Sequence, residues 1–264
     1  MTMRVIESRH GSFIVQDNDH YVGRSLTLYG EYSEGEWALL RQLVKPGDTV
    51  VEAGANIGAH TVPLAKAVEV EGRVYAFEPQ RLIHQMLAGN LALNAIENTH
   101  TFAIALGDRA GQVRIPLIHY GADENYGGVS VQNDGGEAVA MGTIDTLRLD
   151  RLDLLKIDVE GAEFLVLRGA EATIKRTWPP LYLENDRRDQ SPALLAYLIG
   201  LGYEIWWHVP PLFNSGNHFG NADNVFGEIR SVNILCLHKT RASKPPEGVG
   251  LFPVNGVDDW VLPS

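Results

Sequence analysis

The middle of the chain alternates between short apolar runs and stretches in which apolar residues recur at helical spacing. With short connections, this alternation is typical of a parallel sheet that carries helices on both faces. The apolar runs predict strands at residues 49–53, 73–77, 101–106, 152–157, 181–183, 203–209 and 231–239. Helical spacing predicts helices at residues 58–67 and 80–94, from about residue 162, and around residues 192–201. We therefore expect an α/β fold with a doubly wound, mostly parallel sheet.

Both ends of the chain are expected to add smaller pieces to this core. The first 30 residues alternate loosely around polar turns and predict a β-hairpin. Ser33 and Glu36 form a capping-box pattern, which predicts that a helix begins there. The predicted organisation is an N-terminal hairpin and helix at residues 1–45, a main domain at 46–240 with substrate loops near 119–142 and 208–228, and an irregular tail at 241–264.

Composition narrows the classes of function. Of the 264 residues, 45% are hydrophobic, which suffices for a full core, and the formal net charge is -11. A chain this acidic lacks the basic surface of a general nucleic-acid binder. The single cysteine, Cys236, excludes an intrachain disulfide and a cysteine-rich metal site. The N-terminal residues show no apolar core of signal-peptide length, and no run is long enough to span a membrane, so we expect a cytoplasmic protein.

A glycine-containing turn follows the first strand of the main domain. Its form is E-x-G-x-N-x-G, with Glu52, Gly54, Asn56 and Gly58. Glycines at such a turn permit a tight bend and close approach of a ligand to the backbone. The spacing is neither that of dinucleotide folds nor that of a P-loop. Glu52 would repel a pyrophosphate but could accept hydrogen bonds from an ammonium group, so the turn favours a cationic ligand.

A second acid, Glu78, ends the next predicted strand. Acids at this position accept both hydroxyls of a ribose in other nucleoside-binding α/β folds. A ligand that combines an amino-acid cation with a ribose is S-adenosylmethionine. The sequence therefore predicts this cofactor.

Two segments resemble a known family. "VVEAGANIGAHT" and "VYAFEPQ" are similar to motif I and its acidic follow-on in class I S-adenosylmethionine-dependent methyltransferases. "TIDTLRLDRLDLLKIDVEGAEFLVLRGA" resembles the signature of the FkbM family, and the resemblance runs over roughly residues 29–239. It implies a Rossmann-like doubly wound sheet with an antiparallel last strand, and O-methylation, often of sugar or polyketide hydroxyls. Glu52 stands where the family more often has Asp, which changes reach and not charge.

The resemblance also implies where the cofactor lies. Glu52, Gly54, Asn56 and Gly58 would surround its methionine part, next to His60 and Thr61 at the start of the following helix. Glu78 would take the ribose. Pro79 and Ala105 would lie beside the adenine.

A second acidic group is expected to face the cofactor's methyl group. Asp158 closes an apolar strand, and Glu184 and Asn185 close the next one, so together they offer three oxygen ligands. This arrangement is similar to catechol-type O-methyltransferases and predicts a divalent cation such as Mg²⁺. The alternative is catalysis without metal, with Asp158, His208 or His218 as general base. Glu163 is interpreted as complementing the dipole of the helix that follows.

Two segments are candidates for binding the methyl acceptor. They contribute Asn125 and Tyr126, and Phe213, Asn214 and Asn217. Amides and aromatic rings together suit a polyhydroxylated acceptor such as a saccharide, although these residue types also stabilise tight turns. We expect an O-methyltransferase of a small molecule. The alternatives are methylation of a nucleic acid at a 2′-hydroxyl or at nitrogen, and a catalytically silent cofactor-binding domain within a complex; the oligomeric state, a homo-oligomer included, is left open.

Overall fold

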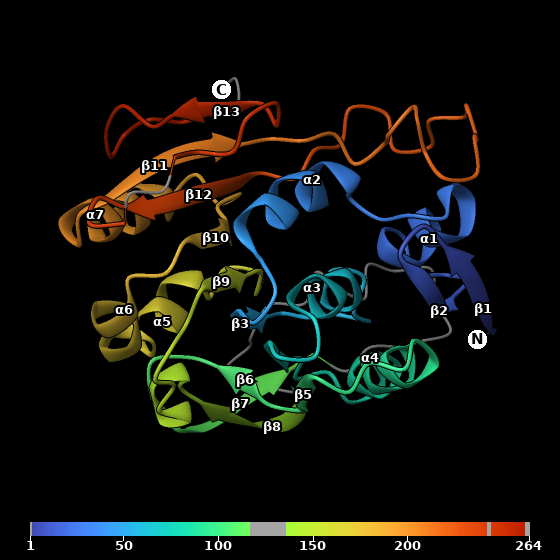
Figure 1. Cartoon of the computed structure of the whole chain (residues 1–264), viewed down its shortest axis with the longest axis horizontal. Helices are drawn as coiled ribbons and strands as arrows, with labels where there is room; N and C mark the ends of the chain where they lie inside the picture. The colour runs from blue at the N-terminus through green and yellow to red at the C-terminus, as the bar shows by residue number, and fades with distance from the viewer. Residues whose placement is uncertain (1, 117–135, 242–243, 262–264) are drawn as a thin grey trace.

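A computed structural model describes residues 2–116, 136–241 and 244–261. Eight strands form its central sheet (Figure 1). Their order is β13 (Leu251–Pro253), β11 (Tyr203–His208), β12 (Asn233–His238), β10 (Leu181–Glu184), β9 (Leu154–Ile157), β3 (Thr49–Ala53), β4 (Arg73–Phe77) and β5 (Thr99–Phe102). The strands from β10 to β5 are parallel, whereas β12 runs antiparallel between β10 and β11. This confirms the predicted doubly wound sheet with an antiparallel last strand.

The strand order reverses between β3 and β9. The chain leaves β3 in one direction, toward β4 and β5, and later returns to place β9 on the other side of β3. Ligands in open α/β sheets bind in the crevice outside the carboxyl ends of the strands at such a switch point. The fold therefore locates a binding site beyond the ends of β3 and β9.

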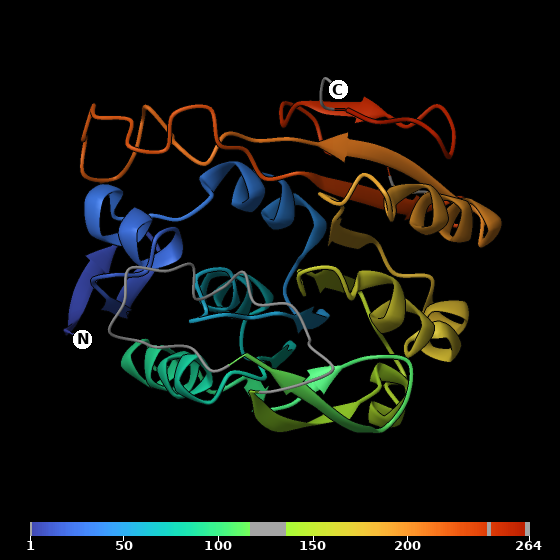
Figure 2. The ribbon, with the colours of Figure 1, turned by 180° about the vertical axis from the view of Figure 1, so that it is seen from behind.

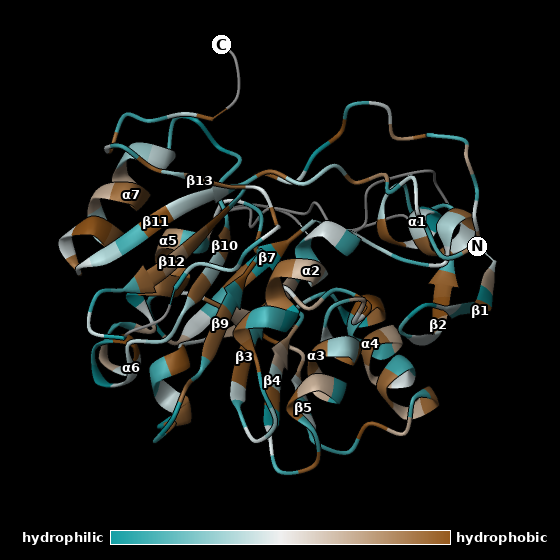
Figure 3. Cartoon of the chain, turned by 45° about the horizontal axis from the view of Figure 1, so that its top comes forward, coloured by the Kyte–Doolittle hydropathy of each residue, from teal (hydrophilic) through white to brown (hydrophobic). Residues whose placement is uncertain are grey.

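Helices cover both faces of the sheet because the buried strands are apolar on both sides. In β3, Val51 packs in a cluster with residues of α5 (Glu163–Arg168), α6 (Glu171–Thr177) and α7 (Ser191–Gly200). Its neighbour Val50 points the other way, into a cluster with α2 (Glu34–Leu43) and α3 (Thr61–Val68). Figure 3 shows hydrophobic residues along β3 and β9, and Figure 2 shows the same layers from behind. The helix α4 (Arg81–Leu93) covers the edge near β4 and β5.

The N-terminal extension contains the predicted hairpin and one helix more than predicted. Strands β1 (Met3–Ser8) and β2 (Gly11–Gln16) pair antiparallel, and α1 (Val22–Tyr29) precedes α2. The predicted capping box is wrong in its chemistry. Ser33 has a left-handed backbone, and its hydroxyl donates to the Glu36 carboxylate at 2.7 Å instead of accepting from the helix backbone. This contact holds Glu36 at the start of α2.

The strand predicted at residues 101–106 is divided between two sheets. Its first part lies in β5, while β6 (Ala105–Leu106) joins a three-stranded sheet with β8 (Glu137–Gly142) and β7 (Gly111–Ile115). A short 3-10 helix (Ile144–Leu147) leads from that sheet toward β9. Asn125 and Tyr126, predicted to contact the acceptor, lie outside the described residues.

The C-terminal tail is less irregular than predicted. β13 adds an antiparallel edge strand to β11, and Trp260 packs edge-on against the buried Trp207 with ring centroids 5.6 Å apart. Within the described ranges, no helix is both long enough and apolar enough for a bilayer crossing.

Candidate functional site

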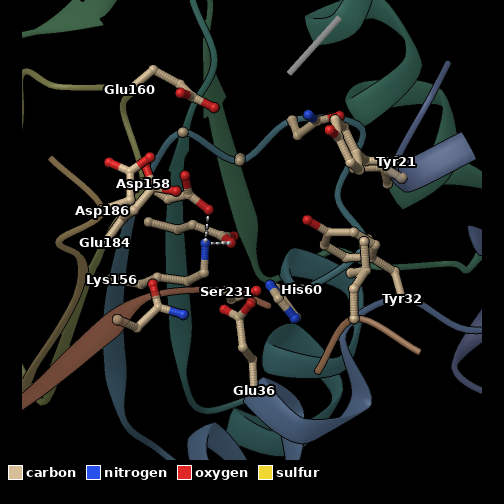
Figure 4. A pocket seen from close by; sticks show the side chains of 18 of the residues that line it. Tyr21, Tyr32, Glu36, His60, Lys156, Asp158, Glu160, Glu184, Asp186 and Ser231 are labelled. Atoms are coloured by element: carbon tan, nitrogen blue, oxygen red, sulfur yellow. Dashed lines mark ion pairs between the residues drawn. The ribbon is translucent and has the colours of Figure 1, made fainter. Parts of the chain in front are cut away.

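Two adjoining cavities open at the switch point of the sheet. The larger encloses about 260 Å³ and has a polar lining; the smaller encloses about 60 Å³. Both are bounded by Gly54, Glu78, Asp158 and Glu160, so these residues mark their junction. Figure 4 shows the larger cavity, with side chains that converge from the ends of β3, β9 and β10 and from the N-terminal helices.

The glycine turn closes tightly over the end of β9. Gly54 has φ of +82°, and a Cβ atom there would lie 1.7 Å from the carbonyl oxygen of Asp158. The backbone N–H groups of Gly54 and Ala55 donate to the carbonyl of Phe77 at 3.0 and 2.9 Å. Only glycine combines this φ with so close an approach of a neighbouring strand. Gly58, in contrast, lines neither cavity, and a Cβ there would meet Leu87.

Glu78 lies where the two cavities meet and is almost fully buried. Its two carboxylate oxygens accept hydrogen bonds from the backbone N–H groups of Asn56 at 3.0 Å and Gln80 at 2.9 Å. Burial raises the pKa of Glu78 to about 7, against the lowering effect of those two bonds. The bonds fix the carboxylate, whose remaining lone pairs can accept from a ligand.

Three charged side chains form a row beneath the turn, and Glu52 and Lys156 are buried whereas Asp158 is partly exposed. Lys156 is 3% exposed, and its Nζ lies 3.5 Å from Glu52 Oε1 and 3.5 Å from Asp158 Oδ2. Glu52 is 1% exposed and also accepts a 2.6 Å hydrogen bond from the Thr61 hydroxyl. Burial raises the pKa of Glu52, although Lys156 opposes this shift. Burial would lower the pKa of Lys156, but Asp158 and Glu52 outweigh it and raise that pKa, so the ammonium stays charged.

His60 lines the larger cavity from the start of α3. The side chain is 5% exposed, and burial together with the nearby Lys156 lowers its pKa to about 3, so the ring is neutral at neutral pH. The ring hydrogen-bonds the backbone of Ser33, and this bond raises its pKa, as a carbonyl acceptor would. Its Nε2 atom has no hydrogen-bond partner among the described residues.

The smaller cavity is largely apolar. Pro79 and Ala105, both predicted to lie beside the adenine, line it together with Phe77, Ile104 and Ile115. A flat aromatic group fits such a lining. The structure thus brings these two residues into one cavity with Glu78.

Three carboxylates gather at the other side of the larger cavity. Oxygen atoms of Asp158, Glu160 and Glu184 lie within 4.8 Å of one another. Burial, followed by repulsion from Asp158, raises the pKa of Glu160 to about 7 and that of Glu184 well above its ordinary value. Glu184 Oε2 is buried and finds no hydrogen-bond partner within the described part of the chain. This group can take a cation.

The predicted ligand Asn185 does not belong to this group. Side chains alternate along a strand, so Asn185 points away from the face that presents Glu184. Its amide donates to the Ser191 hydroxyl at 2.9 Å beside α7, outside the larger cavity. Glu160, which the sequence did not single out as a ligand, lies in this group instead.

Neither predicted histidine base reaches the cavity. His208 is buried behind its wall, where Nδ1 lies 2.8 Å from the Tyr182 hydroxyl. His218 is exposed on the loop that follows β11, and its backbone N–H donates to Glu31 at 2.9 Å. Since neither ring lines the cavity, the structure does not support either as a base.

The predicted acceptor residues on the same loop serve its own conformation. Phe213 packs edge-on against Tyr29, and the Asn214 amide donates to Glu31 at 2.7 Å. The Asn217 amide donates to the carbonyls of Asn214 and Asn221. The turn-stabilising role of these residue types therefore applies here. The loop contributes other residues to the cavity, namely Leu212, Ile229, Arg230 and Ser231.

Sequence reasoning missed several residues that line the larger cavity. Lys156 is the one with a local signal, because a lysine inside the apolar run "LLKI" requires a buried partner. Tyr21, Tyr32 and Glu36 come from the N-terminal extension. They carry no sequence signal for a site, since only the packing of α1 and α2 against the core brings them there.

The comparisons with known proteins identify the family of the chain. The family model of the methyltransferase FkbM domain matches residues 52–205, more than half of the chain. Methyltransferase sdnD from Sordaria araneosa is 29% identical over 194 residues, which cover 55% of this chain and 71% of that protein. The AMB antimetabolite synthetase AmbE from Pseudomonas aeruginosa is 28% identical over 212 residues, which cover 62% of this chain but 10% of that protein.

Among solved structures, methyltransferase FkbM from Methylobacillus flagellatus KT is similar at 18% identity with a TM-score of 0.49. The match covers 71% of this chain and 43% of that one. The fold assignment rests on the strand order, with β12 inserted antiparallel between β10 and β11. By its sequence, the chain belongs to the FkbM family of S-adenosylmethionine-dependent methyltransferases.

Proposed function

We propose that the protein transfers a methyl group from S-adenosylmethionine to a hydroxyl oxygen of a small-molecule acceptor. The observation that carries this proposal is the pair of cavities that meet at Gly54, Glu78 and Asp158. One is apolar and the other is polar and acidic, as a ligand with an adenine at one end and a cationic amino acid at the other requires.

The cofactor would lie across the junction. Its adenine would occupy the cavity lined by Pro79 and Ala105, and its ribose hydroxyls would donate to Glu78. The methionine part would extend past Gly54 into the larger cavity, toward His60. The sulfonium charge is compatible with this cavity, where carboxylates outnumber cationic side chains.

Methyl transfer in this site is an in-line displacement. A lone pair of the acceptor oxygen forms the new bond to the methyl carbon while the carbon–sulfur bond breaks, and its electron pair stays on the neutral thioether of S-adenosylhomocysteine. The hydroxyl proton would pass to the Asp158 carboxylate at the rim of the cavity. Most of the rate enhancement would come from holding the oxygen and the methyl group in attack geometry.

A divalent cation would have a different set of ligands from the one that the sequence predicts. Asp158, Glu160 and Glu184 would hold it, since their oxygens converge and Glu184 Oε2 has no partner among the described residues. Bound to the acceptor oxygen, it would make the hydroxyl easier to deprotonate. If it takes part, a chelator abolishes turnover, added Mg²⁺ restores it, and Glu184→Gln raises the Mg²⁺ concentration needed for half-maximal rate. Full turnover in chelator leaves only the metal-free route.

A saccharide is the acceptor class that we favour, on the sequence resemblance. The acidic lining supports a small molecule over a nucleic acid, because phosphates would be repelled. A catalytically silent domain would have no need of the carboxylates that face the methyl group. The cytoplasmic location and a homo-oligomer stay predictions, which fractionation and size-exclusion chromatography test.

The decisive experiment incubates the protein with labelled S-adenosylmethionine and a panel of sugars, amines and RNA. We expect label in a hydroxylated small molecule, and loss of transfer in Asp158→Asn with S-adenosylhomocysteine binding retained. Label in RNA or in an amine would replace the O-methylation proposal. Binding of S-adenosylhomocysteine without transfer to any acceptor would favour the silent domain.

A further inference from the structure

The motif acid Glu52 is already neutralised within the protein. Its carboxylate has Lys156 Nζ at 3.5 Å and accepts the Thr61 hydroxyl at 2.6 Å, and the side chain is 1% exposed. The sequence reading offered Glu52 as the acceptor for the ammonium group of the cofactor. Because a buried cation occupies that role, the ammonium group needs another partner.

Glu36 has the properties that such a partner needs. It lies in the first turn of α2, is 4% exposed and lines the larger cavity (Figure 4). Its carboxylate accepts a hydrogen bond from the Ser33 hydroxyl at 2.7 Å. No ion pair within the described residues includes Glu36: Lys156 pairs with Glu52 and Asp158, and Glu36 acts on it only at longer range, where it helps to raise the pKa of Lys156. A buried carboxylate without a cation is costly unless a ligand supplies one.

His60 presents a second acceptor to the same cavity. The neutral ring donates to the backbone of Ser33, which leaves a lone pair on Nε2. That atom is buried and has no partner in the part of the chain that the structure describes. Ser33 connects the two side chains, because it donates to Glu36 through its hydroxyl and bonds the His60 ring through its backbone.

We propose that Glu36 and His60 form the subsite for the α-ammonium group of the cofactor's methionine part. A primary ammonium carries three N–H donors and one positive charge, which matches one carboxylate and one neutral acceptor. A hydroxyl would supply one donor and leave the carboxylate charge without a partner. This inference rests on the proposed function, and it makes the N-terminal extension a part of the cofactor site.

Calorimetry with two ligands tests the subsite. S-adenosylhomocysteine carries the amino-acid end, whereas 5′-methylthioadenosine lacks it. We expect Glu36→Gln to weaken S-adenosylhomocysteine about ten-fold or more, since it removes a charge-assisted hydrogen bond, and to change 5′-methylthioadenosine less than two-fold. Glu34→Gln, a substitution in the same helical turn that faces His10, is the matched control and should leave both affinities unchanged.

Other outcomes overturn the inference. Equal weakening of both ligands would mean that Glu36 acts only through the structure. If Glu36→Gln bound S-adenosylhomocysteine more tightly, the carboxylate of the ligand would lie beside Glu36. If its binding were unchanged, no part of the amino-acid end would lie there. His60→Leu gives a second variant with the same expected selectivity, in case Glu36→Gln unfolds. Absence of S-adenosylhomocysteine binding by the unaltered protein would refute the proposed function itself, which keeps the two failures distinguishable.

Discussion

Replacing Lys156 with methionine would leave the Glu52 carboxylate buried at the centre of the sheet without its cation. Methionine has a similar length but no charge, so Glu52 would keep only the Thr61 hydroxyl as a partner. Breaking a buried ion pair by removing one partner costs about 3–5 kcal/mol, because the remaining charge stays desolvated. We assign this cost to Glu52, since Asp158 is 38% exposed at its side chain and water can replace its share of the pair.

Urea unfolding measures the effect, and its pH dependence identifies the cause. Without Lys156, the pKa of Glu52, already raised by burial, should rise further. Between its unfolded and folded pKa values the native state then holds more protons, so the free energy of unfolding falls as pH rises. The variant should therefore be most destabilised at pH 8 and recover as the pH falls and Glu52 becomes protonated.

A double variant serves as the control. Lys156→Met with Glu52→Gln removes both charges, and we expect it to regain about 2 kcal/mol or more relative to the sum of the single variants. A cost for Lys156→Met below about 1 kcal/mol at pH 8, or strict additivity in the double variant, would refute the assignment of a coupled buried pair.

Gly54 in the glycine turn and Glu78, the proposed ribose ligand, can be tested in the same way. Gly54→Ala should abolish cofactor binding or folding, because its Cβ would lie 1.7 Å from the Asp158 carbonyl oxygen; Gly47→Ala, with φ of +83° but open space, should cost only about 1 kcal/mol. Thermal unfolding and calorimetry check both, and equal effects would refute the steric argument. We proposed that Glu78 accepts the ribose hydroxyls in its ionised form, and its pKa is about 7, so affinity for S-adenosylhomocysteine should fall about ten-fold per pH unit below pH 7. Glu78→Ala should bind weakly with this pH dependence removed, and an unchanged pH profile would contradict the assignment.

Much of the fold could be predicted from local patterns. The strand, turn and helix at residues 49–67 follow from an apolar run, two glycines and helical spacing, and the structure has them as β3 and α3. The helix α1 was missed because it is only eight residues long and directly follows the hairpin, against which Val22 and Leu26 pack. The predicted extent of the strand at residues 101–106 was wrong. Its two parts pair with different strands, β5 with β4 and β6 with β8, and these partners are distant in sequence.

In the site, the structure brings together those predicted residues that lie at the ends of neighbouring strands. Glu78, Pro79 and Ala105 follow the ends of neighbouring parallel strands, so the order of the strands suffices to gather them. The prediction failed for Asn185, because alternation along β10 turns that side chain from the cavity, and for His208, which is enclosed by Tyr182. For the loop that follows β11, composition could not separate acceptor contacts from bonds within the loop.

The sequence by itself determined the fold class, the glycine turn proposed to approach the cofactor and the acid proposed to hold its ribose. Those features depend on short-range patterns and on backbone conformations that few residue types can adopt. Only the tertiary structure decided which carboxylates lie beside a buried cation. The register of β3 with β9 sets Glu52 opposite Lys156, and the packing of the N-terminal extension brings Glu36 to the cavity. Which carboxylate is neutralised and which one needs a ligand depends on contacts between distant segments, and no local pattern encodes them.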